Sequence, residues 1–158
     1  AIKNILTAIA TLSKSELGGE RVFVAYDNQD QEDEHSCFSD NTHRDITTNY
    51  LGFRNILTST YKGQSYGKSM LDAVSVEDKT RIITLMKSIE TKIASVNKVA
   101  ITSAHFDYQI QADNSQSKVI VKLKNEMRKL GDEMVNVAKA NGISLTKDDV
   151  TDADETKI

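Results

Sequence analysis

The sequence predicts an all-α fold, a domain resembling a four-helix bundle, from two spacing patterns and one absence. Apolar residues recur at intervals of 4, 3, 4 and 3 from Ile82 to Val96, and at 3, 4, 3, 4 and 3 from Ile120 to Val137. Such heptad-like spacing places one apolar stripe along a helix. The 158 residues include no proline, where an average chain of this length carries about eight at a share of roughly 5%. Long helices with few breaks therefore account for the chain best.

The first predicted helical stretch starts at Ile2, and its apolar stripe continues to Tyr26. Gly18 and Gly19 interrupt it, and each costs about 1 kcal/mol relative to alanine inside a helix. Two interpretations stay open. The glycines either separate two helices, or they let a neighbouring helix or ligand approach closely where no side chain stands.

A second helix is expected from about Asp33 to Tyr61, followed by a loop over residues 62–69, which are rich in glycine and serine. Its apolar side is expected to carry Phe38, Ile46, Tyr50, Phe53, Ile56 and Leu57.

Caps and stops define the remaining elements. Ser69 with Asp72, and Ser75 with Asp78, have the spacing of helix N-caps with an acid at the third helical position. The third helix then runs through the first heptad pattern and ends near a turn at residues 105–108. The fourth is expected to begin near Ser115 or Ser117 and to stop at Gly142. Residues 1–145 form the predicted domain, and residues 146–158 an acidic tail that is mobile or docks elsewhere.

Composition excludes several classes of protein. The net charge is −3, from 20 basic and 23 acidic residues, so the chain lacks the basic face that nucleic-acid binding needs. No apolar stretch approaches the roughly 20 residues of a transmembrane helix, and the first residues do not resemble a signal peptide. The single cysteine, Cys37, excludes an internal disulfide and is interpreted as a small packed side chain.

Residues 30–45 do not follow the pattern of a bundle helix. Placed on a helical wheel, His35, Ser39 and Thr42 point in the same direction as the apolar residues downstream, and Gln31, Glu32 and His43 flank them. Because buried polar groups need partners, such a stripe indicates a polar network, a ligand site or an interface. The alternative is that this part of the helix projects into solvent, where its acids favour the helix N-terminus.

Glu32 and His35 are the candidate metal ligands. Three residues apart, they can face one ion from a single helical turn, and carboxylate with imidazole suits iron or zinc. Two ligands do not complete a site, so the others must come from elsewhere. The His-Glu-x-x-His pattern of zinc hydrolases is absent, as are a glycine-rich phosphate loop and a Gly-x-Ser-x-Gly turn.

Two segments, residues 19–26 (GERVFVAY) and 30–43 (DQEDEHSCFSDNTH), resemble the imelysin family, and within it the iron-regulated protein A-like branch of bacterial envelope proteins. The resemblance covers roughly residues 1–145. It implies an all-helical protein of two bundle-like halves with a functional site between them, periplasmic or associated with the outer envelope, and tied to iron acquisition. Some members are classed as metallopeptidases.

The family's Gly-x-His-x-x-Glu motif is absent, since none of His35, His43 or His105 is followed by Glu three residues later. The resemblance is to the carboxy-terminal half, so the amino-terminal half is the expected partner. Three functions follow: a wall of an iron or iron-chelate site, half of a metal-dependent peptidase, or a structural docking bundle. Iron is the expected metal, with zinc second, and Glu20 and Arg21 would position the wall formed by Gln31, Glu32, His35, Ser39, Thr42 and His43.

Overall fold

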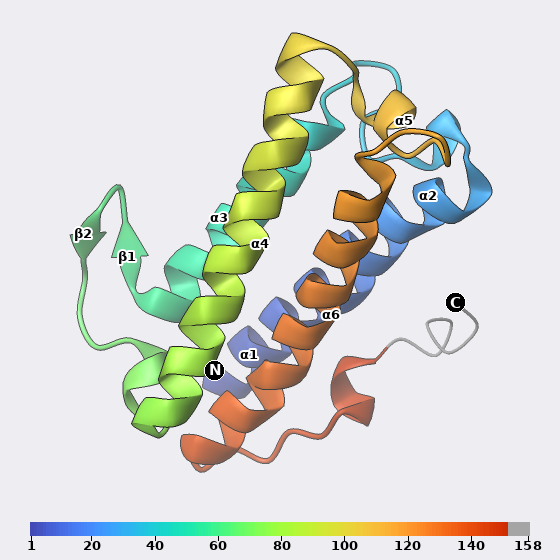
Figure 1. The fold of residues 1–158 in the computed structure, drawn as a ribbon. Helices are drawn as coiled ribbons and strands as arrows, with labels where there is room; N and C mark the ends of the chain where they lie inside the picture. Colours follow the sequence, from blue (N-terminus) through green and yellow to red (C-terminus); the bar gives the residue numbers. More distant parts are fainter. Residues whose placement is uncertain (152–158) are drawn as a thin grey trace.

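Four long helices run alternately up and down in the computed structural model, which describes residues 1–151 (Figure 1). The first comprises three consecutive segments, α1 (Ile2–Thr11), η1 (Leu12–Val24) and α2 (Ala25–Asn28). The others are α3 (Thr42–Thr58), α4 (Val76–Thr102) and α6 (Ser117–Ala140). The predicted all-α, bundle-like fold is confirmed. The apolar residues of the two predicted heptad patterns are buried and form part of its core.

The first helix passes through Gly18 and Gly19 without a break, so the interpretation of two separate helices is wrong. Residues 12–24 are wound as a π-helix, with hydrogen bonds from i to i+5, and both junctions keep helical backbone angles. The other interpretation holds for Gly18. A Cβ built there would lie 2.9 Å from the Ser13 carbonyl oxygen and 3.3 Å from the Met127 Cβ on α6. The missing side chain lets the two helices approach.

The second helix is shorter than predicted. Residues 31–33 form a 3₁₀ turn, η2 (Gln31–Asp33), residues 34–41 form successive turns, and α3 begins only at Thr42. The Asp30 side chain accepts a hydrogen bond from the Glu32 N–H at 2.9 Å, and Asp40 has a left-handed φ of 52°. Local side-chain bonds thus compete with the helix here. As a consequence Phe38, expected in the core, is 94% exposed. Ile56, which was also expected on the apolar side, lies within α3 and is 52% exposed.

A small hairpin follows α3, where a loop was expected. Ser59 adopts a left-handed conformation and ends the helix, and β1 (Thr60–Tyr61) then pairs antiparallel with β2 (Gln64–Ser65). Lys62 and Gly63 between the strands both have positive φ, which is the geometry of a type I′ turn. The hairpin projects from the bundle (Figure 1).

The predicted caps are confirmed. Ser69 and Asp72 form a capping box on the short η3 (Met70–Asp72), and the Ser75 side chain accepts from the Asp78 N–H at the start of α4. After α4 the chain makes the short α5 (Phe106–Gln109), preceded by His105 at its N-cap position. The fourth helix begins at Ser117, and Gly142, with φ +71°, follows its end.

The tail packs against the bundle as far as it is described. Val150, in η4 (Asp148–Val150), is 1% exposed against the core, and the Lys14 amine donates to Thr151 Oγ1 at 2.7 Å and Asp132 Oδ1 at 3.0 Å. The first residues of the predicted tail therefore lie against this bundle itself. Residues 152–158 lie outside the described residues.

Candidate functional site

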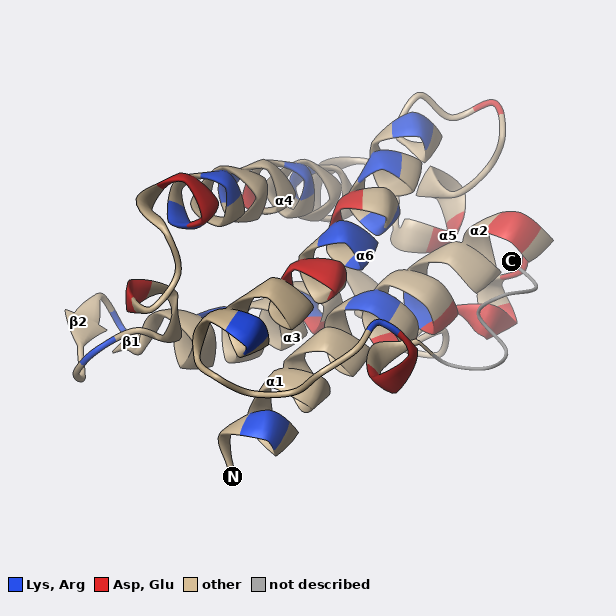
Figure 2. Cartoon of the chain, turned by 90° about the horizontal axis from the view of Figure 1, so that it is seen from below, with Lys and Arg blue, Asp and Glu red and all other residues tan. Residues whose placement is uncertain are grey.

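Eight of the 23 acidic residues lie at one end of the bundle. Seven acids and one arginine lie between residues 27 and 45, and α5 adds Asp107 beside them (Figure 2). Gln29 ties the two segments together, because its amide donates to the Ile110 carbonyl at 2.8 Å and accepts from the Ala112 N–H at 3.0 Å. Gln29 therefore fixes the end of the first helix to the segment that follows α5. This end of the bundle carries a strongly negative charge.

Glu34 is the least expected feature of this end. It is 3% exposed, and neither carboxylate oxygen has a hydrogen-bond partner that meets normal geometry. Burial raises the pKa of Glu34 above its ordinary value, opposed by the nearby Thr42 hydroxyl and reinforced by the charges of Asp107 and Asp40. Such a group is held at a cost, since desolvation disfavours its charged form.

His43, in the first turn of α3, is the second buried titratable group. It is 6% exposed, and its Nδ1 lacks a hydrogen-bond partner. Burial lowers the pKa of His43, and the neighbouring Arg44 lowers it further. The neutral imidazole is the form that ligates a metal. Asp40 and His105 lie near both Glu34 and His43, since each influences both pKa values.

Two further oxygens at this end lack partners. They are Asp107 Oδ1 and Oε1 of the fully buried Gln109, although the Gln109 amide donates to the Val96 and Ala104 carbonyls at 3.1 and 2.9 Å. We call Glu34, Asp40, Thr42, His43, His105 and Asp107 the end cluster. Both oxygens of Glu34 and Oδ1 of Asp107 lack a hydrogen-bond partner of normal geometry, so the end cluster has acceptors for a cation or for a donor from a second molecule.

The predicted site residues divide into two groups. Thr42 and His43 are buried in the end cluster. The other six, Glu20, Arg21, Gln31, Glu32, His35 and Ser39, are exposed. The expectation that residues 31–43 share one inward helical face is wrong, because this segment forms turns. The Thr42 hydroxyl instead accepts from the Ser36 N–H at 3.0 Å and fixes the loop to α3.

The proposed ligand pair loses its geometric basis for the same reason. Glu32 and His35 sit on either side of the end of η2 and share no helical turn. The His35 Nδ1 lies 3.3 Å from Asp45 Oδ2, which also accepts from the Ser36 hydroxyl. Within residues 1–151, no three His, Cys, Asp or Glu side chains converge as a metal-binding group.

Sequence reasoning missed Glu34 because the helical wheel placed it away from the core. The available signal was the density of turn-forming residues downstream, Ser36, Ser39, Asp40 and Asn41, which favour turns over a helix. That composition indicates a compact loop, and a compact loop buries some of its own polar groups.

Residues 1–134 match the sequence model of the Imelysin family, which carries a peptidase label. The chain belongs to the imelysin family. The match covers the whole bundle except the last turns of α6 and the tail, so the end cluster lies within the imelysin region. No curated protein matches the chain. In the described part of this imelysin chain, no helix is long and apolar enough to cross a membrane.

Proposed function

We propose that this imelysin chain forms one wall of an iron-binding site in a bacterial envelope protein that takes part in iron acquisition. Glu34 and His43 would contact the iron or iron chelate, and the remaining ligands would come from the amino-terminal half of the same protein. The observation that carries the proposal is the buried Glu34 carboxylate, neither oxygen of which has a hydrogen-bond partner of normal geometry.

The donor chemistry supports the proposal in part. Carboxylate oxygen and neutral imidazole nitrogen are ordinary ligands of iron and zinc. The end cluster offers both kinds, with Asp107 Oδ1 as a further free oxygen. A cation would reduce the electrostatic repulsion among the acids of this end, of which seven lie between residues 27 and 45. The described residues supply too few converging ligands for a complete site, which is why a second segment is part of the proposal.

Titration of ferrous iron into the full natural protein, followed by calorimetry, tests the proposal. Glu34→Gln and His43→Gln should each weaken binding at least about tenfold, which corresponds to 1.4 kcal/mol. Glu32→Gln is the matched control, because it removes the same charge from an exposed position two residues away. Equal affinities of wild type and Glu34→Gln would contradict the proposal, as would the absence of saturable iron binding.

A metal-dependent peptidase is the second candidate, and the peptidase label of the family favours it. Such an enzyme requires a metal-bound water and a general base. In the full protein, chelator-sensitive cleavage of a denatured protein substrate that is lost in Glu34→Gln would support it. Cleavage that persists in Glu34→Gln would show that this end of the bundle takes no part in the reaction.

A further inference from the structure

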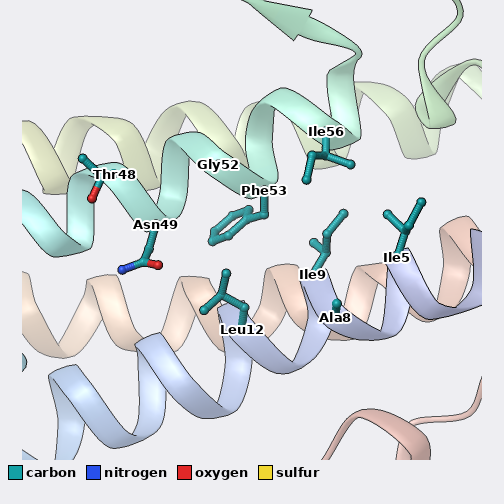
Figure 3. A pocket seen from close by; sticks show the side chains of 9 residues that line it. All are labelled: Ile5, Ala8, Ile9, Leu12, Thr48, Asn49, Gly52, Phe53 and Ile56. Carbon is teal, nitrogen blue, oxygen red and sulfur yellow. The ribbon is translucent and has the colours of Figure 1, made fainter.

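A hollow lies between the end of α3 and the hairpin that follows it. Its lining residue Ile56 also lines the apolar groove between α1 and α3, which Figure 3 shows with Gly52 in its α3 wall. The hollow has a volume of about 370 Å³ and is lined by Asn55, Ile56, Ser59, Thr60, Tyr61 and Tyr66. None of these side chains is charged, so the hollow has no ionic partner for a phosphate, a carboxylate or a metal ion.

Two tyrosine rings line the hollow from one face of the hairpin. Tyr61 pairs with Gln64, and the Tyr66 N–H donates to the Ser59 carbonyl at 2.8 Å, so Tyr66 stands opposite Ser59. Because alternate residues of a strand point to the same side, Tyr61 and Tyr66 are diagonal neighbours on one face. Their side chains are 54% and 66% exposed. Both rings are therefore available to a ligand.

The hairpin is fixed to α3 although it projects from the bundle. The Ser59 hydroxyl donates to the Lys68 carbonyl at 2.9 Å. The Ser69 hydroxyl donates to the Leu57 carbonyl, in the last turn of α3, at 3.0 Å. These bonds tie the returning strand to the end of the helix. The rings are thus positioned before a ligand arrives, and binding does not have to order them.

Neutral polar groups surround the two rings. Asn55 Oδ1 accepts from the Arg54 guanidinium at 3.4 Å, and within residues 1–151 the Asn55 amide nitrogen donates to no protein acceptor. The Tyr61 hydroxyl also has no protein hydrogen-bond partner in that part of the chain, whereas the Tyr66 hydroxyl donates to Gln64 Oε1 at 3.2 Å. A ligand in the hollow would meet a free amide donor and a free hydroxyl beside apolar ring faces.

A pyranose ring matches this chemistry. When all its hydroxyls are equatorial, as in β-linked glucose, both faces of the sugar present only C–H groups, which pack against the electron-rich face of an aromatic ring. The hydroxyls stand at the edge of the sugar, where they reach amide and hydroxyl partners. A flat aromatic ligand would leave those polar groups unused. An extended peptide would pair with the free backbone edge of the hairpin instead of lying across its face.

We propose that the hairpin hollow binds one sugar unit of a neutral glycan of β-linked glucose or N-acetylglucosamine. The sugar ring lies against Tyr61 and Tyr66, and its hydroxyls bond the Asn55 amide. The hollow lies at the carboxy-terminal end of α3, whereas the end cluster includes the first turn of that helix. The inference therefore does not depend on the iron proposal.

Saturation-transfer difference NMR on the full natural protein, with cellotriose and with tri-N-acetylchitotriose, tests the proposal. The method detects the weak binding expected of a single sugar unit. Wild type should give a saturable signal that is strongest at the axial C–H protons of one sugar ring. Sorbitol is the matched control ligand, because it has similar hydroxyls but no ring face, and it should give no saturable signal.

Four variants locate the binding. Tyr61→Ala combined with Tyr66→Ala should abolish the signal, whereas the corresponding double Phe variant keeps both rings and should bind at most about fivefold more weakly. Tyr108→Ala, at a tyrosine of similar exposure (61%) on α5, is the control and should leave binding unchanged. Asn55→Leu removes the amide donor from α3, outside the hairpin, and should weaken binding about fivefold. The Tyr66 amide proton, bonded to the Ser59 carbonyl, reports whether the hairpin stays formed.

Several results would overturn the proposal. They are the absence of a saturable signal with both trisaccharides, a signal of equal strength with sorbitol, and a signal that persists in the double alanine variant. Unchanged affinity in Asn55→Leu would contradict the position of the sugar. Sedimentation of wild type with phosphatidylcholine vesicles that requires both tyrosines, without sugar binding, would identify a lipid surface as the occupant instead.

Discussion

The two sides of the first helix differ in how closely a neighbour approaches. Where the first helix meets α6, each helix has a glycine that packs closely against the other helix. A Cβ on Gly18 would lie 3.3 Å from the Met127 Cβ, and one on Gly131 would lie 2.7 Å from the Lys14 Cβ and 2.9 Å from the Ala10 carbonyl oxygen. Toward α3, Gly52 faces open space. The same residue type thus serves close packing on one side and leaves a groove on the other.

The first helix packs more closely against α6 than against α3. The first helix and α6 share a buried polar bond as well, from the Ser13 hydroxyl to the Met127 carbonyl at 2.8 Å. The α1/α3 side holds exposed Ile5 and Ile56 in its place. The closest contacts of the first helix therefore lie on its α6 side, and its α3 side leaves apolar side chains exposed.

Gly131→Ala should have the largest effect, because its methyl group would overlap the Lys14 Cβ and the Ala10 carbonyl. Overpacking of this kind costs about 1–3 kcal/mol, or a fall in melting temperature of roughly 2–12 °C at about 2–4 °C per kcal/mol for a domain of this size. Thermal unfolding followed by circular dichroism measures it. An unchanged melting temperature would mean that the helices can separate without cost.

Ser13→Ala tests the polar part of the same contact. It removes a buried hydrogen bond to the Met127 carbonyl, and we expect a loss of about 1 kcal/mol in the free energy of unfolding. Urea unfolding gives the value. Thr91→Ala, at an exposed helical hydroxyl on α4 that bonds the Lys87 carbonyl at 2.9 Å, is the control and should change stability much less.

Gly52→Ala should stabilise the protein, in contrast to Gly131→Ala, because the new methyl group meets nothing. The expected gain is roughly 0.5–1 kcal/mol from the lower flexibility of the unfolded chain and the better helix propensity. The same urea experiment measures it. A loss of stability would show that α1 and α3 close over the groove in solution.

The smallest expected effect is a change in how the free energy of unfolding depends on pH, caused by the end cluster. Because burial raises the pKa of Glu34, the folded protein holds a proton that the unfolded chain releases, so stability falls as pH rises from the ordinary carboxyl range toward the raised pKa. Glu34→Gln should remove this decline and exceed wild type in stability at neutral pH, with no gain at low pH.

The shifted pKa of His43 changes stability with pH in the direction opposite to that of Glu34. Because burial lowers the pKa of His43 below 6.5, the unfolded chain binds the proton more readily, and stability falls as pH drops below that value. Unfolding free energies of wild type, Glu34→Gln and His43→Gln between pH 4 and 8 separate the two contributions. Parallel curves for all three proteins would contradict the assignment.

Helix-forming patterns in the sequence predicted most of the fold. The heptad spacing of α4 and α6, the caps at Ser69 and Ser75 and the stop at Gly142 depend on contacts within a few residues, and all are confirmed. The extension of the second helix to residue 33 was wrong. A helical wheel assumes a helix, and it cannot register that bonds such as the Ser36 N–H to Thr42 bond stabilise a turn instead.

The candidate site shows the same division. The sequence located the unusual segment, residues 30–45, and two of its buried members, Thr42 and His43. It did not locate Glu34, because burial of that carboxylate depends on how the loop folds over α3 and α5. Asp107 and His105 join the cluster from more than 60 residues away, and no local pattern relates them to it.

The sequence by itself determined which segments form the long helices, the cluster of acidic residues around residue 35 and membership of the imelysin family. Periodicity, capping and charge are properties of neighbouring residues, so they can be read along the chain. Only the tertiary structure decided which glycine is packed and which is open, and which acid is buried without a partner. Those properties depend on the distance between segments that are remote in sequence, and a distance of a few tenths of an ångström changes their energy.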